Sequence, residues 1–600
     1  MSTKASASAA GVAWDLSVLF DAPDDPKIHA ASDAVLKRAK RFAKRYRGAI
    51  KAKPTAARLL EALREYESLQ EAAVKIGAYA HLIYAADTTK DAHRDLLQRV
   101  DEMETQLRNL VLFFDLEWLA VPEAAAKKLL ADPRLAAYRH YLSNERKYKP
   151  HMLSEPEEQA VNEKSMTGLT AWQKLHTEFT SNLRYKIAVE GETRELNQSE
   201  ALVLMRHPKR ETRRAAWEGF FGALAANSSV LSFIYDTRFQ DFLVDSRMRK
   251  YKGHMTPRHL ANGIEAKAVD AMMRVVERNH ALAHRYWALK ARLLGLPSLQ
   301  LYDQYAPLFD VKEKISYADA KKIVLDALGR FSPEFEAMAQ RFFDGNWIDA
   351  DPRNGKRGGA FCAGVTPSTH PFILMSYNDD MRDVMTLAHE LGHGMHDLLA
   401  ARQTFLSYHP SLPVAETASV FAEMLVFDAL TGAMKNDRDR LSLLCGKIED
   451  SFATVFRQTV LTRFEQLAYE ARSKGRLSGK QIGELWLRAN APYYGDGVAL
   501  TQGYEYGWSY IPHFISTPFY CYAYSFGDLL VKALYGMYRR EGDAFIPKYK
   551  ALLASGGSQT PRQQTRTVGV DIASEAFWQI GFDELERLIA EAERLAPAVL

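Results

Sequence analysis

Two histidines and a glutamate form the most chemically specific pattern in the chain, His-Glu-Leu-Gly-His at residues 389–393. Apolar residues around it recur at helical spacing, so His389 and His393 lie on one face of a predicted helix. Neutral imidazole is a preferred zinc ligand, and a catalytic zinc takes three protein ligands and one water whose pKa falls to about 7. With 17 histidines in the chain, the pattern is expected by chance only about 0.03 times. The sequence therefore predicts one catalytic zinc ion per chain, with Glu390 as the base, in preference to two histidines on a solvated helix face.

A third ligand must come from outside this segment. The compact zinc-protease pattern, with Gly three and His six residues after the second histidine, is excluded because those positions hold His396 and Leu399. Glu416 follows a proline that suits the start of the next predicted helix. We therefore predict that His389, His393 and Glu416 bind the metal, and that His396 does not, because the site is then filled.

Two further carboxylates lie near the predicted ligands in sequence. Glu423 is two helical turns beyond Glu416, and Asp397 is four residues after His393. Each is placed to orient a ligand histidine through its second ring nitrogen. A structural salt bridge is the alternative role for both.

Hydrolysis of a peptide bond also needs donors for the oxyanion that forms when water attacks the carbonyl. The aromatic segment 508–527 holds His513, Tyr520 and Tyr524. The two tyrosines, four residues apart, would share a helix face, with Tyr522 pointing elsewhere. Aromatic clusters usually belong to the core, but the nearby histidine favours contact with substrate. We predict His513, Tyr520 and Tyr524 as catalytic residues.

The rest of the chain is predicted to be mostly helical. Trp14, Leu16, Leu19 and Phe20 are expected to anchor the N-terminal segment on the body of the protein. Alternation through a glycine turn predicts a small hairpin over 183–196. From residue 31 to 153 the pattern predicts successive helices, at 34–46, 55–68, 72–86, 90–114 and 123–130.

Two segments before the histidine helix have alternative interpretations. The apolar run 371–377 predicts a strand, and a strand beside a zinc helix offers a free edge to an extended peptide; an ordinary sheet strand is the alternative. The Arg-rich stretch 207–214 suggests either an anionic partner or a solvated helix start, and its apolar followers favour the helix start.

Composition indicates a globular protein without a nucleic-acid partner. The chain is 47% hydrophobic, and its net charge of +4 is small for 600 residues with interspersed acids and bases. No secretion signal and no run approaching 18 apolar residues is visible, so we expect a cytoplasmic protein that binds no membrane. Three scattered cysteines agree with a reducing compartment.

Taken together, these motifs resemble oligoendopeptidase F, in the thimet oligopeptidase family of zinc metallopeptidases. Supporting stretches include 14–20, Gly-Lys-Arg-Gly-Gly at 355–359, and Ile-Pro-His-Phe at 511–514. The resemblance implies a mostly α, two-lobed ellipsoid with a deep central channel and a small β-sheet beside the zinc helix. We expect a helical N-terminal lobe over 1–196 and a catalytic domain over 197–600.

The resemblance also implies a function: cleavage of internal bonds in short oligopeptides, with folded proteins spared. It assigns the three predicted ligands to zinc, Glu390 to the base, and His513 with one of Tyr520, Tyr522 and Tyr524 to stabilising the transition state. A carboxypeptidase-like or dipeptidyl-releasing peptidase is an alternative, and would need a cation for the substrate carboxylate. Another is an inactive helical peptide-binding protein, against which Glu390 argues. The available cations considered are Lys356, Arg357 and Arg382.

Overall fold

The computed structural model describes residues 8–52, 54–309 and 314–600. Helices hold 70% of the residues and strands 4%, about twice the helix content of an average globular protein. The predicted mostly helical fold with small sheets is therefore confirmed. A division at residue 196 into lobe and catalytic domain stays a prediction. The chain forms two compact units, unit 1 from Met1–Lys149, Lys312–Ala433 and Met537–Val570, and unit 2 from Pro150–Val311, Met434–Gly536 and Asp571–Leu600.

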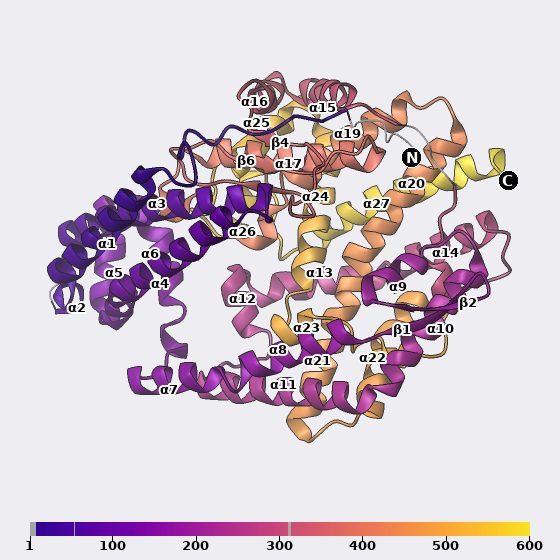
Figure 1. Cartoon of the computed structure of the whole chain (residues 1–600), viewed down its shortest axis with the longest axis horizontal. Helices are drawn as coiled ribbons and strands as arrows, with labels where there is room; N and C mark the ends of the chain where they lie inside the picture. The colour runs from indigo at the N-terminus through magenta and orange to yellow at the C-terminus, as the bar shows by residue number, and fades with distance from the viewer. Residues whose placement is uncertain (1–7, 53, 310–313) are drawn as a thin grey trace. The chain divides into compact units, whose positions relative to one another are not determined.

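Unit 1 combines an N-terminal set of helices with the histidine helix and a three-stranded sheet (Figure 1). Its principal elements are α1 (Pro26–Tyr46), α2 (Ala49–Ala52), α3 (Ala56–Ala86), α4 (Asp91–Ala120), α5 (Glu123–Ala131), α6 (Arg139–Arg146), α15 (Tyr317–Phe331), α16 (Pro333–Asp344), β4 (Ile348–Asp349), β5 (Phe361–Ala363), β6 (Phe372–Leu374), α17 (Met381–Ala400), α18 (Leu412–Ala415), α19 (Ser419–Ala433), α25 (Ile546–Leu553) and α26 (Pro561–Thr567).

Unit 2 is helical apart from two short two-stranded sheets, β1 with β2 and β3 with β7. The long helix α24 (Tyr522–Glu541) is shared between the units: its residues up to Gly536 belong to unit 2, and those from Met537 belong to unit 1. The other elements are α7 (Glu155–Ser165), α8 (Leu169–Asn182), β1 (Tyr185–Val189), β2 (Glu192–Leu196), α9 (Gln198–Leu204), α10 (Arg210–Ala226), α11 (Ser228–Met248), α12 (Thr256–Asn262), α13 (Ala266–Arg278), α14 (His280–Leu293), β3 (Leu299–Gln300), α20 (Asp437–Ser451), the π-helical η5 (Phe452–Phe456), α21 (Arg457–Lys474), α22 (Gly479–Tyr494), β7 (Val498–Ala499), α23 (His513–Ser516) and α27 (Glu575–Leu595).

The core of the N-terminal helices is centred on Phe42 of α1. Its ring is fully buried and contacts the rings of Tyr66 on α3 and Phe114 on α4. The helix begins where the Asp25 side chain accepts a hydrogen bond from the backbone N–H of Lys27. The helices predicted at 55–68 and 72–86 are one helix, α3, because no proline or glycine interrupts the residues between them.

The sheet of unit 1 lies beside the histidine helix α17 (Figure 1). Strand β6, predicted within 371–377, pairs in parallel with β4 and antiparallel with β5. The prediction that this strand offers a free edge is therefore wrong, since both its edges are used. The two edge strands are β4, which is buried, and β5, which is half-buried. Trp14 packs against Phe361 and Phe372 of this sheet, as expected of an N-terminal anchor.

The hairpin predicted over 183–196 is confirmed as β1 and β2 in antiparallel register. Its two turn residues, Glu190 and Gly191, have φ of 53° and 90°, as a type I′ turn requires. The neighbouring Arg-rich stretch does begin a helix, α10, but it is not solvated throughout. Arg210 and Arg213 bind the buried carboxylate of Asp303 at 2.7 and 3.0 Å, which a reading of local sequence could not reveal.

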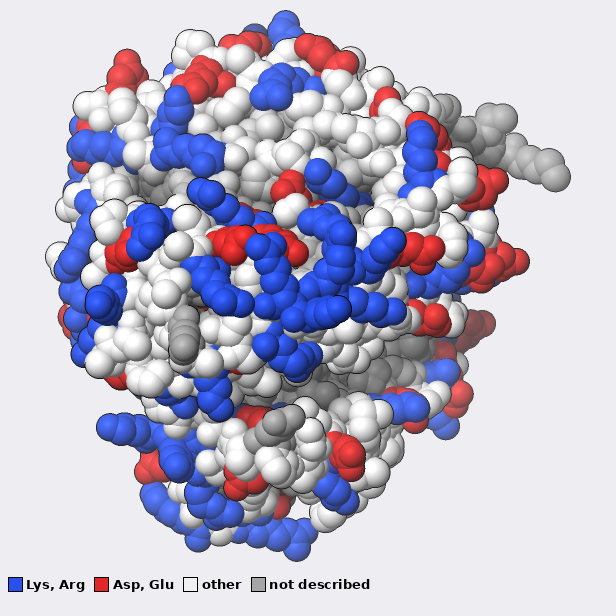
Figure 2. Space-filling model, turned by 90° about the vertical axis from the view of Figure 1, so that its left-hand side faces the viewer, with Lys and Arg blue, Asp and Glu red and all other residues white. Residues whose placement is uncertain are grey.

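The solvent face of α1 is basic. Lys37, Lys40, Arg41 and Lys44 are exposed there, and Arg47, directly after the helix, is exposed as well. Figure 2 shows basic side chains gathered in a band across the face on this side of the molecule, with acidic side chains among them.

Of the helices in the described parts of the chain, none combines the length and the apolar character needed to span a bilayer.

We expect Phe42→Ala to lower the free energy of unfolding of unit 1 by about 3–5 kcal/mol, because a buried ring is lost and a cavity remains. Circular dichroism during heating, combined with limited proteolysis, measures the effect. Leu112→Ala on α4 is the control, since Leu112 is 52% exposed and its loss should change stability by less than about 0.5 kcal/mol. Equal destabilisation by both changes would contradict this account of the core.

Candidate active site

The helix α17 presents His389 and His393 at the border of its buried face. Its first turn is closed by a reciprocal capping box between Asp380 and Asp383. Residues on the inner face, including Leu387 and Leu391, are fully buried. The two histidines are half-buried. Helical packing therefore fixes the backbone while leaving the imidazole rings reachable.

A close approach between α17 and α19 brings the third predicted ligand to the histidines. A Cβ atom on Gly392 would lie 2.5 Å from both the Ala418 carbonyl oxygen and the Ser419 Cα. Only glycine permits this spacing. Glu416 lies in the turn between α18 and α19, so the expectation that a helix carries it is wrong. The four-residue α18 ends at the preceding residue.

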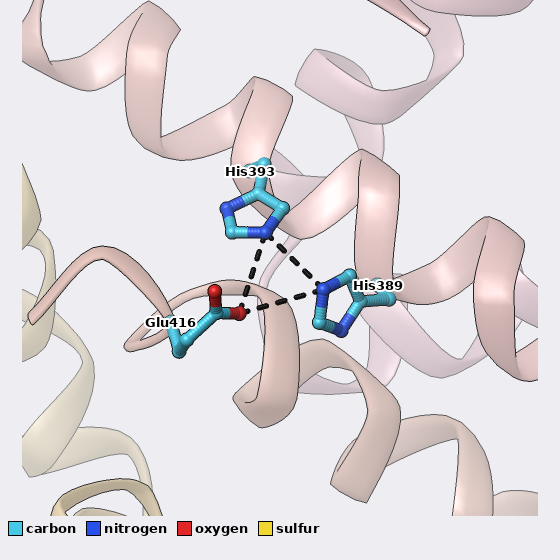
Figure 3. Close-up of side chains that lie close together, drawn as sticks. All are labelled: His389, His393 and Glu416. Carbon is cyan, nitrogen blue, oxygen red and sulfur yellow. Dashed lines mark hydrogen bonds and ion pairs between the residues drawn. The ribbon is translucent and has the colours of Figure 1, made fainter. Parts of the chain in front are cut away.

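The three predicted ligand atoms converge (Figure 3). Nε2 of His389 and Nε2 of His393 are 3.2 Å apart, and each lies 3.4 Å from Oε2 of Glu416. Tetrahedral zinc with bonds of 2.0–2.2 Å separates its ligand atoms by about 3.4 Å. Two imidazoles and a carboxylate are also a donor set that zinc accepts. The residues therefore fit a bound zinc ion in both chemistry and spacing.

Two side chains from α19 hold these ligands in place. Glu423 Oε1 accepts a hydrogen bond from Nδ1 of His389 over 2.6 Å, which directs Nε2 at the other ligands. Ser419 Oγ donates to Glu416 Oε2 over 2.7 Å. Sequence reasoning suggested Glu423 but missed Ser419, whose only signal is its position three residues after Glu416. Asp397 is buried, and burial raises its pKa to about 7, but no hydrogen bond joins it to His393 in the described structure.

Glu390 is buried beside the two ligand histidines. Its residue is 5% exposed, and its Oε2 has no hydrogen-bond partner among the residues that the structure describes. Burial raises the pKa of this carboxyl, while His389 and His393 lower it. A buried carboxylate oxygen without a protein partner suits a group that exchanges protons with water. His396 is buried and is not among the three described residues whose ligand atoms converge.

The predicted oxyanion donors form a cluster of their own in unit 2. His513, the first residue of α23, has Nε2 3.2 Å from the Tyr524 hydroxyl. The ring of Tyr520 stacks on His513 at 5.6 Å and meets Tyr524 edge-on at 5.1 Å. Burial and the nearby Arg457 lower the pKa of His513, so its imidazole is neutral at neutral pH. Tyr524 is 38% exposed, so its side chain is accessible.

The helix that was predicted to carry both tyrosines begins only at Tyr522, so Tyr520 precedes it and that prediction is wrong. Phe519 has a φ of 57°, and this left-handed residue breaks the helical path. The turn nonetheless keeps the two rings together. Tyr522 points away as predicted, since it is fully buried and its hydroxyl accepts a hydrogen bond from Asn262 over 2.9 Å.

Of the cations considered for a substrate carboxylate, Lys356 is not available. Its Nζ is bound to Asp349 Oδ1 at 2.7 Å, and both side chains are buried. Arg357 and Arg382 are exposed. None of the three lies in unit 2.

Comparison with known families gives two matches. A family model described as Peptidase family M3 matches residues 203–584, and one described as Oligopeptidase F matches residues 117–185. The first match contains the histidine helix, Glu416 and the segment from His513 to Tyr524.

Individual relatives cover nearly the whole chain. Oligopeptidase PepF of Bacillus subtilis (strain 168) is 26% identical over 594 residues, which span 97% of this chain and 88% of the relative. An oligoendopeptidase F homolog of Lactococcus lactis subsp. lactis (strain IL1403) is 26% identical over 545 residues, 90% of each chain.

Two solved structures share the fold. The crystal structure of oligoendopeptidase-F from Enterococcus faecium has a TM-score of 0.69 at 23% identity, covering 93% of this chain and 97% of that one. A crystal structure from Chlamydophila abortus has a TM-score of 0.87 at 22% identity, covering 97% and 98%.

We expect Glu423→Ala to weaken metal binding about 10- to 100-fold, because the His389 ring loses the partner that orients it. Competition with a chelating dye measures the affinity. Asp397→Asn is the comparison, and should retain the affinity of the unchanged protein because Asp397 makes no hydrogen bond to His393. If both changes weaken binding equally, the orienting role of Glu423 is refuted.

Proposed function

Since the chain belongs to peptidase family M3, we propose that it is a zinc-dependent endopeptidase that hydrolyses internal bonds of oligopeptides. Membership confirms the resemblance found in the sequence motifs. The relatives named oligopeptidase or oligoendopeptidase support the substrate class. The observation that carries the proposal is the set of three ligand atoms, 3.2 to 3.4 Å apart, next to the buried Glu390.

His389, His393 and Glu416 would hold the metal. When bound, zinc acidifies a coordinated water and polarises the carbonyl of the scissile bond. The protein keeps the ligands ready for it: Glu423 holds the His389 ring, and Ser419 holds the Glu416 carboxylate. The pKa of Glu416 is lowered to about 2. Burial alone would raise it, but the hydrogen bond with His393 and the charges of His393 and His389 have the larger, opposite effect. Glu416 is therefore an anion across the physiological pH range.

Glu390 is the proposed general base. Its unpartnered Oε2 accepts a proton from the attacking water and then delivers it to the leaving amine. Burial favours this double role, since a raised pKa brings the carboxyl closer to the working pH. An inactive peptide-binding protein would have no use for a buried, unpartnered carboxylate at this position.

His513 with Tyr520 or Tyr524 is proposed to donate hydrogen bonds to the oxyanion. Support comes from the mutual contact of the three side chains, the accessibility of Tyr524, and the single family match that spans both them and the ligands. A neutral imidazole and a phenol are donors suited to a developing negative charge. The half-buried edge of β5 supports a further proposal, that an extended substrate pairs with this strand.

Glu390→Gln should reduce kcat by about 10²–10⁴-fold, because it keeps size and hydrogen bonding but removes the base. Metal content should stay at one ion per chain. Steady-state kinetics with a quenched fluorescent oligopeptide and elemental analysis of the same sample measure the two quantities. His393→Ala is the control and should lose the metal as well as activity. Undiminished turnover in Glu390→Gln, or stoichiometric zinc in His393→Ala, would contradict the assignment.

Replacing Tyr524 or Tyr520 by Phe should lower kcat about 10²–10³-fold in at least one case, the cost of one lost oxyanion donor. KM should stay within a few-fold, because the bond forms only in the transition state. Tyr522→Phe is the matched control, since that hydroxyl is already bound by Asn262. A large loss in Tyr522→Phe alone would show that another face of the segment meets the substrate.

A further inference from the structure

Unit 2 contains two arginines, close to one tyrosine, that have no carboxylate partner among the described residues. Arg457 begins α21, and its Nη2 donates to the Tyr510 hydroxyl over 2.9 Å. The Arg206 guanidinium lies 4.9 Å from the centre of the Tyr305 ring. Tyr305 is within electrostatic range of both arginines and of Tyr510. In the described parts of the chain, neither Arg206 nor Arg457 forms an ion pair.

Other charged side chains of unit 2, in contrast, are paired within the protein. Arg210 and Arg213 share the buried Asp303. Glu449 is bound by the buried Lys290 at 2.6 Å. The carboxylates near the cluster are therefore already paired with other cations. Arg206 and Arg457 leave a local excess of positive charge.

The side chains of the cluster are partly accessible to solvent. Arg457, Tyr305 and Tyr510 are half-buried, and Arg206 is exposed. Of the five N–H donors that a guanidinium carries, Arg457 uses one in a hydrogen bond within the described structure. A partly desolvated cation without a counter-charge is unfavourable, and a bound anion offsets that cost. Arg457 also follows directly on the π-helical η5, and such irregular turns frequently occur at functional sites.

We propose that Arg457, with Tyr510, Tyr305 and Arg206, binds the C-terminal carboxylate of the peptide substrate. The planar guanidinium fork matches a carboxylate, and the tyrosine hydroxyls can donate to its remaining lone pairs. Tyr510 precedes His513 by three residues, and Arg457 is close enough to act electrostatically on that imidazole. This assignment rests on the proposed function, because it assumes that His513 contacts the substrate. It implies that the protein distinguishes a peptide with a free C-terminal carboxylate from the same peptide with a C-terminal amide.

Paired peptides test the proposal. One quenched oligopeptide is prepared with a free C-terminal carboxylate and with a C-terminal amide. The unchanged protein should prefer the acid at least about tenfold in kcat/KM, mostly through KM, as one charged hydrogen-bonded contact allows. In Arg457→Met and Tyr510→Phe this preference should fall towards one. Arg214→Met is the control, since Arg214 is exposed and paired with Glu218 at 2.8 Å, and should keep the full preference.

A binding measurement separates this proposal from the peptidase assignment. Titration calorimetry on the Glu390→Gln protein, with and without Arg457→Met, gives Kd for the acid and the amide without turnover. Tighter binding of the acid that depends on Arg457 supports the carboxylate site even if no peptide is cleaved. Equal Kd values for acid and amide would overturn it.

Two further outcomes also decide the matter. The first uses an amidated peptide in which Glu replaces Gln near the C-terminus. If this peptide binds more tightly through Arg457, while a free terminal carboxylate gives no such gain, the site recognises an acidic side chain and the proposal is overturned. A loss of thermal stability in Arg457→Met, with the preference for the acid intact, would make the arginine structural. Arg457→Lys, which keeps the charge but not the fork, should restore only part of the preference.

Discussion

The metal site depends on how closely two helices approach one another. Glu416 belongs to the turn that precedes α19, and it reaches the histidines of α17 only because Gly392 lets the Ser419 backbone come into contact. The same approach brings Ser419 and Glu423 to the ligands that they orient. The absence of a side chain at Gly392 therefore lets the two histidines meet Glu416, which lies more than twenty residues further along the sequence. Any side chain larger than hydrogen at this position would separate them.

Both functional regions contain charged side chains that are not balanced by an opposite charge among the described residues. Beside the histidines, Glu390, Glu416 and Glu423 form an excess of carboxylate that a divalent cation balances. Around Arg457 the excess is positive, and the partner we infer is an anion. Elsewhere, buried charges such as Asp303 and Lys356 are matched within the chain. Because burying an unmatched charge is costly, a bound ion or charged ligand would stabilise both regions.

Sequence patterns predicted the features that have a local cause. The period of α17 placed His389 and His393 together, and the turn residues Glu190 and Gly191 located the hairpin. Features set by tertiary packing were not visible. Strands β4 and β5 have two and three residues, too few for an alternating pattern, so the pairing of both edges of β6 could not be foreseen. Tyr520 left the predicted helix because one left-handed residue precedes it. Ser419 is recognisable only once α19 lies against α17.

The order in which the units are assembled from the chain has a consequence for biosynthesis. Residues up to 149 hold a core of their own around Phe42 and can fold as they emerge from the ribosome. The metal-binding helices cannot finish so early, because α19 packs on α25. There the fully buried Tyr549 stacks on Phe421 and donates to the Thr417 carbonyl over 2.9 Å. The packing that supports the ligand cluster is therefore complete only after α25 has been synthesised, more than 100 residues after Glu416.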